Sequence, residues 1–430
     1  MNRKVNVLVF PCGAENAIEV FYALKDVVNI EVFGASGKSD HGEYLFKNLI
    51  SDVPMISASD FLDAFRGIIE KFRIDVVVPT HDDVVLKLAE CESRIPARLL
   101  IHGLYQARVA RSKKTTYQIF SGMEFCPKVY SQPSEVVKYP VFVKPDVGQG
   151  GKGAVVIQNK DDWDKLILNL EDYVITEYLP GEEYTVDCFT DKHHVLRFVG
   201  PRLRARVSNG ISTRSRIVDL SDELKSIAQT ISDRLKLNGL WYFQVKADSN
   251  NQLRLLEVSL RVAGSMNLFR GAGVNFPLLA IYNALGYDVT ILRNNFALEV
   301  DRALVSRYKH NIDYEHVFID FDDTITHGDD VNHEVISFLF HARNSGRQIT
   351  LLTRHAHDIY STLNKLRIHH ELFDKIIVLD SIEKKSNFID KNSKSVFIDN
   401  AFAERKDVFE NCNVPVFDVD AIGVLMDWHR

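Results

Sequence analysis

The sequence lacks paired cysteines, long apolar runs and a strong excess of either charge. Its five cysteines lie singly and their number is odd, so we expect free thiols in a reducing compartment instead of a disulfide framework or a cysteine metal site. No stretch approaches the roughly 20 apolar residues of a membrane helix, and the short apolar run at the N-terminus favours a first strand over a signal peptide. A net charge of -6 gives no reason to expect nucleic acid as a main partner. We therefore expect a cytoplasmic protein that binds neither membranes nor nucleic acid.

Length and strand–helix alternation indicate several α/β domains. At 430 residues the chain is too long for one ordinary core, so we expect two or three domains. The first 104 residues alternate apolar strand patterns, such as Val5 to Phe10 and Val76 to Pro79, with helical spacing, which predicts a doubly wound α/β domain. The polar cluster at 80–83 follows the end of a strand, where open sheets bind ligands. Capping of the next helix by Asp82 or Asp83 is the alternative interpretation.

The rest of the chain is organised around Tyr139 to Gly153, YPVFVKPDVGQGGKG. An apolar strand ends in Lys144, and a loop with four glycines and Lys152 follows. Glycines let backbone N–H groups turn toward an anion, and lysines supply point charges for polyphosphate oxygens. The apolar run at 154–157 closes a hairpin and does not open a helix, which argues against a P-loop or a dinucleotide-binding fingerprint. A plain surface hairpin is the alternative.

Other elements surround this loop in a specific order. They are a helix start at Ser112 to Lys114, the segment EYLPGEEYTVD at 177–187, the arginine-rich segment PRLRARVSNGIS at 201–212, two paired strands at 241–247 and 252–259, and Arg261. The set resembles the ATP-grasp superfamily, most closely its carbamoyl-phosphate-synthetase and biotin-carboxylase-like branch, over roughly the first 300 residues. The resemblance implies a pre-ATP-grasp domain at 1–104 and an α+β ATP-grasp domain at 105–303, with ATP and Mg²⁺ (or Mn²⁺) as cofactors.

The resemblance also implies roles for individual residues. The ATP-binding set, which holds the phosphates, the adenine and the ribose, comprises Lys113, Lys144, Gln149, Gly150, Gly151, Lys152, Gly153, Glu177, Tyr178, Leu179 and Glu183. The metal site comprises Gln244, Glu257 and Ser259. Arg261 would stabilise charge at the reacting phosphoryl or acyl-phosphate centre. Arginine forks bind carboxylates and phosphates, so the arginine-rich segment would hold an anionic substrate through Arg202, Arg204, Gly210 and Ser212.

Ser259 departs from the family pattern, and several site residues have ordinary alternatives. ATP-grasp enzymes usually place an asparagine and then a proline where this chain has Ser259 and Leu260. A serine hydroxyl is a weaker Mg²⁺ ligand than an amide carbonyl, so the departure bears on metal affinity and turnover. Glu183 could instead be a solvated loop charge, and Lys113 could extend from its helix into solvent. As an edge-strand alternative, five arginines could simply line the edge of a sheet with charge: Arg202, Arg204, Arg206, Arg214 and Arg216.

A polar linker at 304–314 precedes a final domain at 315–430. Its first apolar run, Val317 to Ile319, leads into Asp320 and Asp322. The i, i+2 spacing puts both carboxylates on one side of a strand tip. One carboxylate can then attack phosphorus while the other transfers a proton. A turn or a helix cap is the alternative interpretation of Asp322 and Asp323.

Four motifs of this domain resemble the haloacid-dehalogenase (HAD) phosphatase family, which implies a Rossmann-like fold. The gaps from Thr324 to Thr353 and from Thr353 to Lys385 leave no room for a sizeable cap domain, so we expect a capless fold. By this resemblance Asp320 is the nucleophile and Asp322 the general acid/base. Thr353 binds the phosphoryl group, and Lys385, in preference to Lys384, neutralises charge. The implied Mg²⁺ site comprises Asp320, Asp322 through its backbone carbonyl, Asp399 and Glu404, with Asn400 as an alternative to Glu404. Asn400 stands where the family commonly has a second aspartate.

The sequence therefore predicts a bifunctional enzyme. One part would be an ATP-dependent carboxylate–amine ligase that acts through an acyl phosphate, and the other a Mg²⁺-dependent phosphomonoester hydrolase that acts through an aspartyl-phosphate. The expected partners are a small carboxylate, an amine and a phosphomonoester, and a homodimer is one assembly to consider. Two alternatives stay open: an enzyme that forms carbamoyl phosphate or carboxyphosphate, and an ATP-binding regulatory protein with a degenerate HAD module.

Overall fold

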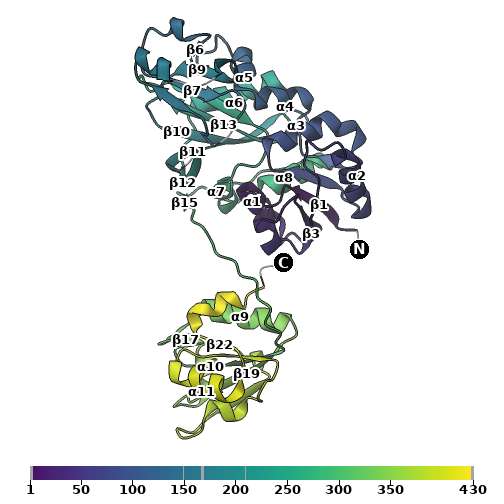
Figure 1. The fold of residues 1–430 in the computed structure, drawn as a ribbon, viewed down its shortest axis with the longest axis vertical. Helices are drawn as coiled ribbons and strands as arrows, with labels where there is room; N and C mark the ends of the chain where they lie inside the picture. The colour runs from purple at the N-terminus through teal and green to yellow at the C-terminus, as the bar shows by residue number, and fades with distance from the viewer. Residues whose placement is uncertain (1–2, 149, 166–168, 209, 428–430) are drawn as a thin grey trace. The chain divides into compact units, whose positions relative to one another are not determined.

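Figure 1 shows the fold in a computed structural model that describes residues 3–148, 150–165, 169–208 and 210–427. The chain divides into two units between Leu304 and Val305, at the start of the range predicted as a linker. Within the described ranges no helix combines the length and the apolar content needed to cross a membrane. Each unit is built around its own sheets.

The N-terminal sheet is parallel and is covered on both faces. Its strand order is β3-β2-β1-β4-β5. The elements are β1 (Val5–Phe10), α1 (Glu15–Leu24), β2 (Ile30–Ala35), β3 (Asn48–Ile50), α2 (Phe61–Lys71), β4 (Val76–Pro79), α3 (Asp82–Cys91) and β5 (Arg98–Leu99). Helix α1 packs on Val7 and Val9, whereas α2 and α3 pack on the face that carries Leu8 and Phe10. This arrangement is the doubly wound sheet that strand–helix alternation predicts.

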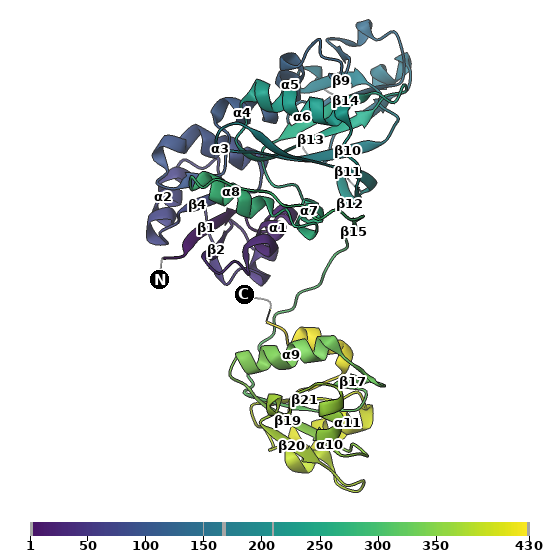
Figure 2. The same ribbon diagram turned by 180° about the vertical axis from the view of Figure 1, so that it is seen from behind.

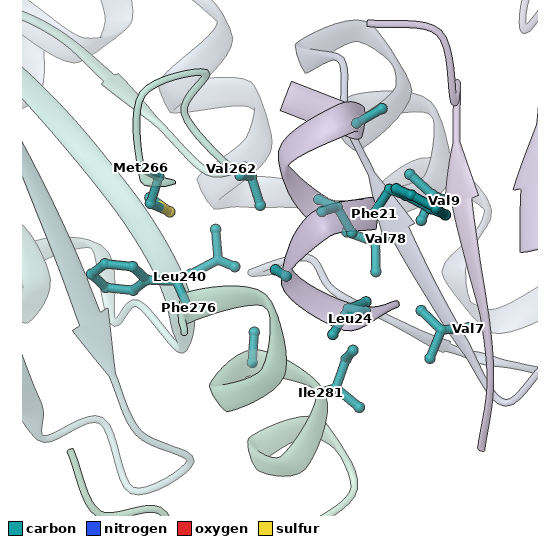
Figure 3. Packing of buried hydrophobic residues seen from close by; sticks show 14 of the residues in the cluster. Val7, Val9, Phe21, Leu24, Val78, Leu240, Val262, Met266, Phe276 and Ile281 are labelled. Atoms are coloured by element: carbon teal, nitrogen blue, oxygen red, sulfur yellow. The ribbon is translucent and has the colours of Figure 1, made fainter. Parts of the chain in front are cut away.

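The two parts of the N-terminal unit share one hydrophobic core. Figure 3 shows α1 between the parallel sheet, marked by Val7 and Val9, and α8 (Phe276–Ala284), which contributes Ile281. Helix α1 therefore buries its second apolar face only against residues from the far end of the unit. The division predicted at residue 104 is not a break in this core, and the two parts are held together by apolar burial.

Two antiparallel sheets form the rest of this unit. The larger has the order β14-β13-β10-β11-β12-β15 and the smaller the order β6-β9-β7-β8. The strands are β6 (Val129–Tyr130), β7 (Val141–Pro145), β8 (Val155–Ile157), β9 (Tyr173–Glu177), β10 (Glu183–Thr190), β11 (Leu196–Ser208), β12 (Ile211–Ile217), β13 (Gly239–Ala247), β14 (Leu253–Ser259) and β15 (Glu299–Asp301). The helices are α4 (Leu104–Arg111), α5 (Lys113–Ile119), α6 (Asp222–Leu235) and α7 (Asn267–Gly271). Helix α6 covers the larger sheet (Figure 2), with Ile227 and Ile231 in one cluster with Trp241 and Phe243.

The C-terminal unit is a five-stranded parallel sheet in the order β20-β19-β16-β21-β22. Its strands are β16 (His316–Ile319), β19 (Gln348–Thr353), β20 (Lys375–Val378), β21 (Ser395–Ile398) and β22 (Val416–Phe417), and its helices are α9 (His333–Asn344), α10 (Ile359–Lys365) and α11 (Phe402–Cys412). Val317 of β16 packs in the cluster of Phe338 on α9, and Phe318 packs in the cluster of Val408 on α11. Both faces of the sheet are therefore covered.

A small hairpin and helix α9 connect β16 to β19. A hairpin of β17 (Thr326–His327) and β18 (Asp330–Val331) lies between β16 and α9. Lys385 begins a 3-10 helix of four residues, Lys385–Phe388. Within the described ranges, neither the connection from β16 to β19 nor that from β19 to β21 carries a separate cap domain.

The segment between the units yields a prediction for proteolysis. Residues 302–313 have no regular secondary structure, and most of their side chains are exposed. Because proteases cut exposed, irregular backbone first, we expect trypsin to cleave after Arg307 or Lys309 before any site within either unit. Mass spectrometry of the early fragments measures this. An Arg307→Gln/Lys309→Gln variant is the control and should lose the early cut, whereas first cuts within a sheet would contradict the prediction.

Candidate functional site

Two adjoining cavities lie in the N-terminal unit. The first has a volume of about 240 Å³, and the second has a volume of about 460 Å³. The residues that border both are Lys113, Gly148, Gly150, Lys152, Arg204, Gly210, Gln244 and Glu257. The first cavity is also lined by the predicted ATP-binding residues Lys144, Gly151, Glu177, Tyr178, Leu179 and Glu183. Gly153 does not line either cavity, and the prediction for Gln149 falls outside the described residues.

Lys144 is a buried amine at the end of β7. Its Nζ donates to the Tyr117 hydroxyl at 2.7 Å and to the Leu256 carbonyl at 3.2 Å. The Tyr117 hydroxyl donates in turn to the same carbonyl at 2.8 Å. Burial, with a further contribution from the Lys113 ammonium, lowers the pKa of Lys144 to about 7. Neither of these two contacts of Lys144 Nζ is with a carboxylate. A protonated Lys144 therefore suits a site that receives an anion.

Lys113 is held at the entrance to α5 by a polar contact between two chain segments. Ser112 caps the helix by accepting from the Thr115 N–H at 3.1 Å, and its hydroxyl donates to Asp146 at 3.0 Å. Asp146 also accepts from the Lys114 N–H at 2.7 Å. Burial lowers the pKa of Lys113. The Lys113 side chain is thus half-buried beside the cavities, and the alternative of a lysine that extends into solvent does not apply.

The glycine-rich hairpin touches the tip of a second hairpin. Gly210 lies between β11 and β12 with φ 74°, and a Cβ at this position would stand 2.2 Å from the carbonyl carbon of Gly150. Only glycine fits where the two backbones approach so closely. The Gly150 segment therefore borders a cavity and is not a plain surface hairpin.

Glu183 is ion-paired at the start of β10. Its carboxylate lies 3.0 Å from Arg204 Nε and 3.8 Å from Lys246 Nζ. Arg204 also donates to the Gly210 carbonyl at 2.7 Å. The alternative of a solvated loop charge is therefore wrong for Glu183, and Arg204 links the hairpin tip to the cavity wall.

Gln244 and Glu257 can hold a divalent metal. They face each other across β13 and β14, and both border the two cavities. Mg²⁺ prefers oxygen ligands and commonly takes one or two carboxylates together with substrate phosphates. One carboxylate and one amide beside two lysines fit such an ion. Ser259 borders the second cavity alone, and its hydroxyl donates to Asp82 Oδ1 at 3.0 Å.

Asp82, the first residue of α3, contacts Ser259 at the end of β14 and Arg261 just beyond it. Its Oδ2 lies 3.0 Å from Nε and 2.9 Å from Nη2 of Arg261. Burial disfavours the Asp82 carboxylate, but Arg261, Ser259 and Arg111 together lower its pKa. The cap of α3 is His81, which accepts from the Asp83 N–H at 3.3 Å. Capping by Asp82 or Asp83 is therefore wrong, and Asp82 positions Arg261, a contact that the sequence did not reveal.

The arginine-rich segment serves two structural purposes. Arg202 is 2% exposed, and its Nε donates to Asp187 at 2.7 Å while Nη1 donates to Ser265 at 3.0 Å. Breaking a buried pair costs about 3–5 kcal/mol, so Arg202 is fixed in the wall of the second cavity. Its contact with a substrate stays a prediction. Arg206 and Arg214 pair with Asp301 at the sheet edge, as the edge-strand alternative expects.

Three other predicted or nearby polar residues border the second cavity. Ser212 borders it, and its hydroxyl lies 2.7 Å from that of Ser215. Thr185 Oγ1 is buried there and has no hydrogen-bond partner among the described residues. Arg302 borders the same cavity and pairs with Glu15 at 2.7 Å. The second cavity therefore holds the Thr185 hydroxyl, which has no partner among the described residues, together with the ion-paired Arg261 and Arg302.

A second constellation lies at the carboxyl ends of the parallel strands of the C-terminal unit. Asp320 follows β16, Thr353 ends β19 and Asp399 follows β21. Lys385 Nζ lies 2.5 Å from Asp320 Oδ1 and 2.6 Å from Asp399 Oδ2. Burial raises the pKa of Asp320, and burial together with Asp320 raises that of Asp399. Thr353 Oγ1 is buried without a hydrogen-bond partner among the described residues. The nucleophile, threonine and lysine predicted from the sequence are thus brought together.

The alternative ligands Glu404 and Asn400 have protein partners of their own, and the Thr324 hydroxyl that contacts Asn400 also lies 3.5 Å from Asp320 Oδ2. Glu404 pairs with Arg354 Nη1 at 2.5 Å, and Asn400 Oδ1 accepts from the Thr324 hydroxyl at 3.3 Å. In the part of the chain that the structure describes, no three His, Cys, Asp or Glu side chains form a metal-binding group. The prediction of Glu404 as a ligand is therefore corrected to an arginine anchor. Asp320 and Asp399 converge and fit a divalent cation that a phosphate and the Asp322 carbonyl would complete.

Part of the N-terminal unit matches a known family. Residues 169–303 match the family described as "ATP-grasp in the biosynthetic pathway with Ter operon". A D-alanine--D-alanine ligase of Fusobacterium nucleatum subsp. nucleatum is 29% identical over 85 residues, which are 20% of this chain and 30% of that ligase. The chain thus spans less than a third of the length of this curated relative.

Solved structures share the fold of the N-terminal unit. Biotin carboxylase of Campylobacter jejuni, in a beta-gamma-ATP complex, has a TM-score of 0.59 at 14% identity over 68% of this chain and 74% of that chain. N5-carboxyaminoimidazole synthetase of Staphylococcus aureus, complexed with ADP, has a TM-score of 0.57 at 15% identity over 67% and 79%. At such identities the likeness is one of fold. Together with the family match, it supports the ATP-grasp superfamily for the N-terminal unit.

The pKa of Lys144 yields a pH prediction for nucleotide binding. Below a pKa of about 7 the amine is charged, and above it the charge is lost. We therefore expect MgATP affinity to fall as the pH rises from about 7 to 9, because a charge-assisted hydrogen bond of about 1.5–3 kcal/mol weakens. Lys144→Ala should weaken binding about 10- to 100-fold at low pH. Isothermal titration calorimetry measures both effects.

Lys144→Arg is the matched control, because arginine keeps its charge throughout this range. Its MgATP affinity should depend on pH much less than that of the wild type. An equal pH dependence in Lys144→Arg and the wild type would assign the titration to another group and contradict the prediction.

Proposed function

Because the N-terminal unit has the ATP-grasp fold, we propose that the protein is an ATP-dependent carboxylate–amine ligase. The observation that carries the proposal is a cavity in which Lys113, Lys144 and Glu257 meet beneath two touching glycine hairpins. Lysines suit phosphates, and a carboxylate suits the Mg²⁺ that accompanies them. Mg²⁺, when bound by Glu257 and Gln244, would supply charge neutralisation at the transferred phosphoryl group.

The proposed reaction has two steps. A substrate carboxylate oxygen attacks the γ-phosphorus of ATP, the bond to the β,γ-bridging oxygen breaks, and an acyl phosphate and ADP form. An amine then attacks the acyl carbon, phosphate leaves, and the ammonium proton is lost to give an amide, ADP and phosphate. Most of the catalysis in phosphoryl transfer is positioning and charge stabilisation. The residues of the two cavities supply both.

Each cavity takes one half of this work. Lys113 and Lys144 would hold the phosphates in the first cavity, where Glu183 and the 177–179 segment would contact ribose and adenine. Arg261, positioned by Asp82, would stabilise the charge that develops on the carboxylate and the acyl phosphate in the second cavity. The glycine hairpin would exclude water from the acyl phosphate, which hydrolyses readily if exposed.

We also propose that the C-terminal unit hydrolyses a phosphomonoester. Asp320 attacks phosphorus, and the ester oxygen leaves with a proton from Asp322. Water activated by Asp322 then cleaves the aspartyl-phosphate and restores both groups. Lys385 between Asp320 and Asp399 offsets the charge of the nucleophile and the phosphoryl group. Thr353, whose buried hydroxyl lacks a partner among the described residues, would donate to a phosphoryl oxygen.

Acceptor-stimulated ADP release tests the ligase. We expect MgATP turnover to appear with the correct carboxylate and amine in a pooled library, and a new amide to appear by mass spectrometry. Glu257→Ala should reduce the rate at least about 100-fold, because a single carboxylate helps to neutralise the transferred phosphoryl group. Splitting the active pools identifies the substrates.

Other outcomes separate the alternatives. Bicarbonate-dependent ADP release without an amine would favour an enzyme that forms carboxyphosphate. ATP binding without stimulation by any pool would contradict the ligase and favour a regulatory ATP-binding protein. Glu124→Ala, on an exposed loop outside both cavities, is a matched acidic control that should retain wild-type turnover.

A phosphoester panel tests the C-terminal unit in the full chain. We expect hydrolysis of at least one phosphomonoester, and Asp320→Asn should reduce it at least about 1000-fold because the covalent nucleophile is lost. Asp313→Asn, an exposed aspartate near the start of the unit, is the control and should retain activity. Equal rates in Asp320→Asn and the wild type would contradict the proposed phosphatase.

A further inference from the structure

His355 joins the proposed acid/base Asp322 to helix α10. Its Nδ1 lies 2.9 Å and 3.0 Å from the two carboxylate oxygens of Asp322. Its Nε2 lies 2.8 Å from the Thr362 hydroxyl. The His355 side chain is 9% exposed and that of Asp322 is 52% exposed. A nearly buried imidazole therefore holds an exposed carboxylate from one side and is itself held from the other.

Thr362 anchors the far side of the His355 ring. Its Oγ1 donates to the Asp358 carbonyl at 3.1 Å and lies 2.8 Å from His355 Nε2. The ring is therefore attached to α10 through Nε2, while Nδ1 contacts both oxygens of the Asp322 carboxylate. The imidazole thus fixes the carboxylate relative to α10.

The surroundings of His355 add constraint and little other charge. The Phe321 ring packs edge-on at 5.1 Å between centroids, and the His357 ring lies at 5.8 Å. The Asp358 carboxylate accepts from the Ser361 N–H as the cap of α10. Asp320, two residues before Asp322, is paired with Lys385. Asp322 is thus the acidic side chain that contacts His355 directly.

We propose that His355 is a positioning residue that orients the Asp322 carboxylate during phosphomonoester hydrolysis. The inference rests on the proposed phosphatase function of the C-terminal unit. In the first step a proton moves from Asp322 to the leaving ester oxygen as the P–O bond breaks. In the second step Asp322 takes a proton from the attacking water as the aspartyl-phosphate bond breaks. Asp322 therefore ends each cycle with the proton it started with, and His355 holds it in place for both steps.

The fold explains why Asp322 needs such a partner. Asp322 lies beyond the end of β16, and Asp323 after it has a left-handed φ of 54°, so the backbone turns away at once. Within the described ranges no cap domain covers this side chain. His355 follows β19, the neighbouring strand, and reaches the carboxylate from there. The strand register thus supplies the contact that a cap would otherwise provide.

Leaving-group dependence in the full chain tests the proposal. A proton donor matters most when the leaving group is basic. We expect His355→Ala to slow hydrolysis of an alkyl phosphomonoester about 10- to 100-fold, and to change the burst of 4-nitrophenolate from 4-nitrophenyl phosphate by less than about threefold. His355→Gln, which can still donate to Asp322, should recover part of the alkyl rate but lose the wild-type pH profile. His357→Ala is the matched histidine control and should match the wild type.

Nitrogen-15 NMR of histidine-labelled full chain supplies a readout that does not need turnover. We expect the His355 ring signals to shift in Asp322→Asn and in Thr362→Val, because each variant alters a contact of the ring. His355 signals that do not change in Asp322→Asn would overturn the proposal, as would equal losses on both substrates in His355→Ala. A wild type without any phosphatase activity would overturn the catalytic role as well as the proposed function. Wild-type hydrolysis with an unaffected His355→Ala would overturn this inference alone.

Discussion

Charges that leave water need a partner or lose their proton, and both candidate sites depend on how this constraint is met. In the C-terminal unit Lys385 lies between Asp320 and Asp399, because two buried carboxylates could not otherwise stand so close. In the N-terminal unit Arg202 is matched by Asp187. Lys144 and Lys113 differ from these groups, since the hydrogen bonds of their Nζ atoms within the described residues go to hydroxyl and carbonyl oxygens only. Burial lowers the pKa of both, and an anionic ligand would complete them.

Ion pairing also separates the arginines of the N-terminal unit into those with a structural role and one at the proposed reaction centre. Arg202 is fixed by a buried ion pair, and Arg206 and Arg214 close a sheet edge with Asp301. Arg261 is different, because its partner Asp82 begins α3, shortly after β4. Val78 of β4 shares one core with Val262, the residue after Arg261. The position of a charge at the proposed reaction centre is thus set by apolar burial elsewhere in the unit.

In the C-terminal unit, the parallel sheet determines which side chains meet. Asp320, Thr353 and Asp399 converge because β16, β19 and β21 are neighbours that end at the same edge. The contact of His355 with Asp322 has the same origin, since His355 follows β19. Glu404 lies on α11, where Arg354 binds it. One register therefore assembles the proposed nucleophile, its counter-ion and the support of the acid/base.

The sequence by itself determined the strands, the order of the motifs along the chain and the residue types at the strand ends, because apolar periodicity and glycine placement act locally. It predicted β1 and β4, and it identified most residues of the first cavity in advance. Only the tertiary structure decided the partners. Asp82 with Arg261, Arg354 with Glu404 and His355 with Asp322 are side-chain pairs between segments far apart in the chain. Such contacts depend on strand register and on a shared core, and no local pattern encodes them.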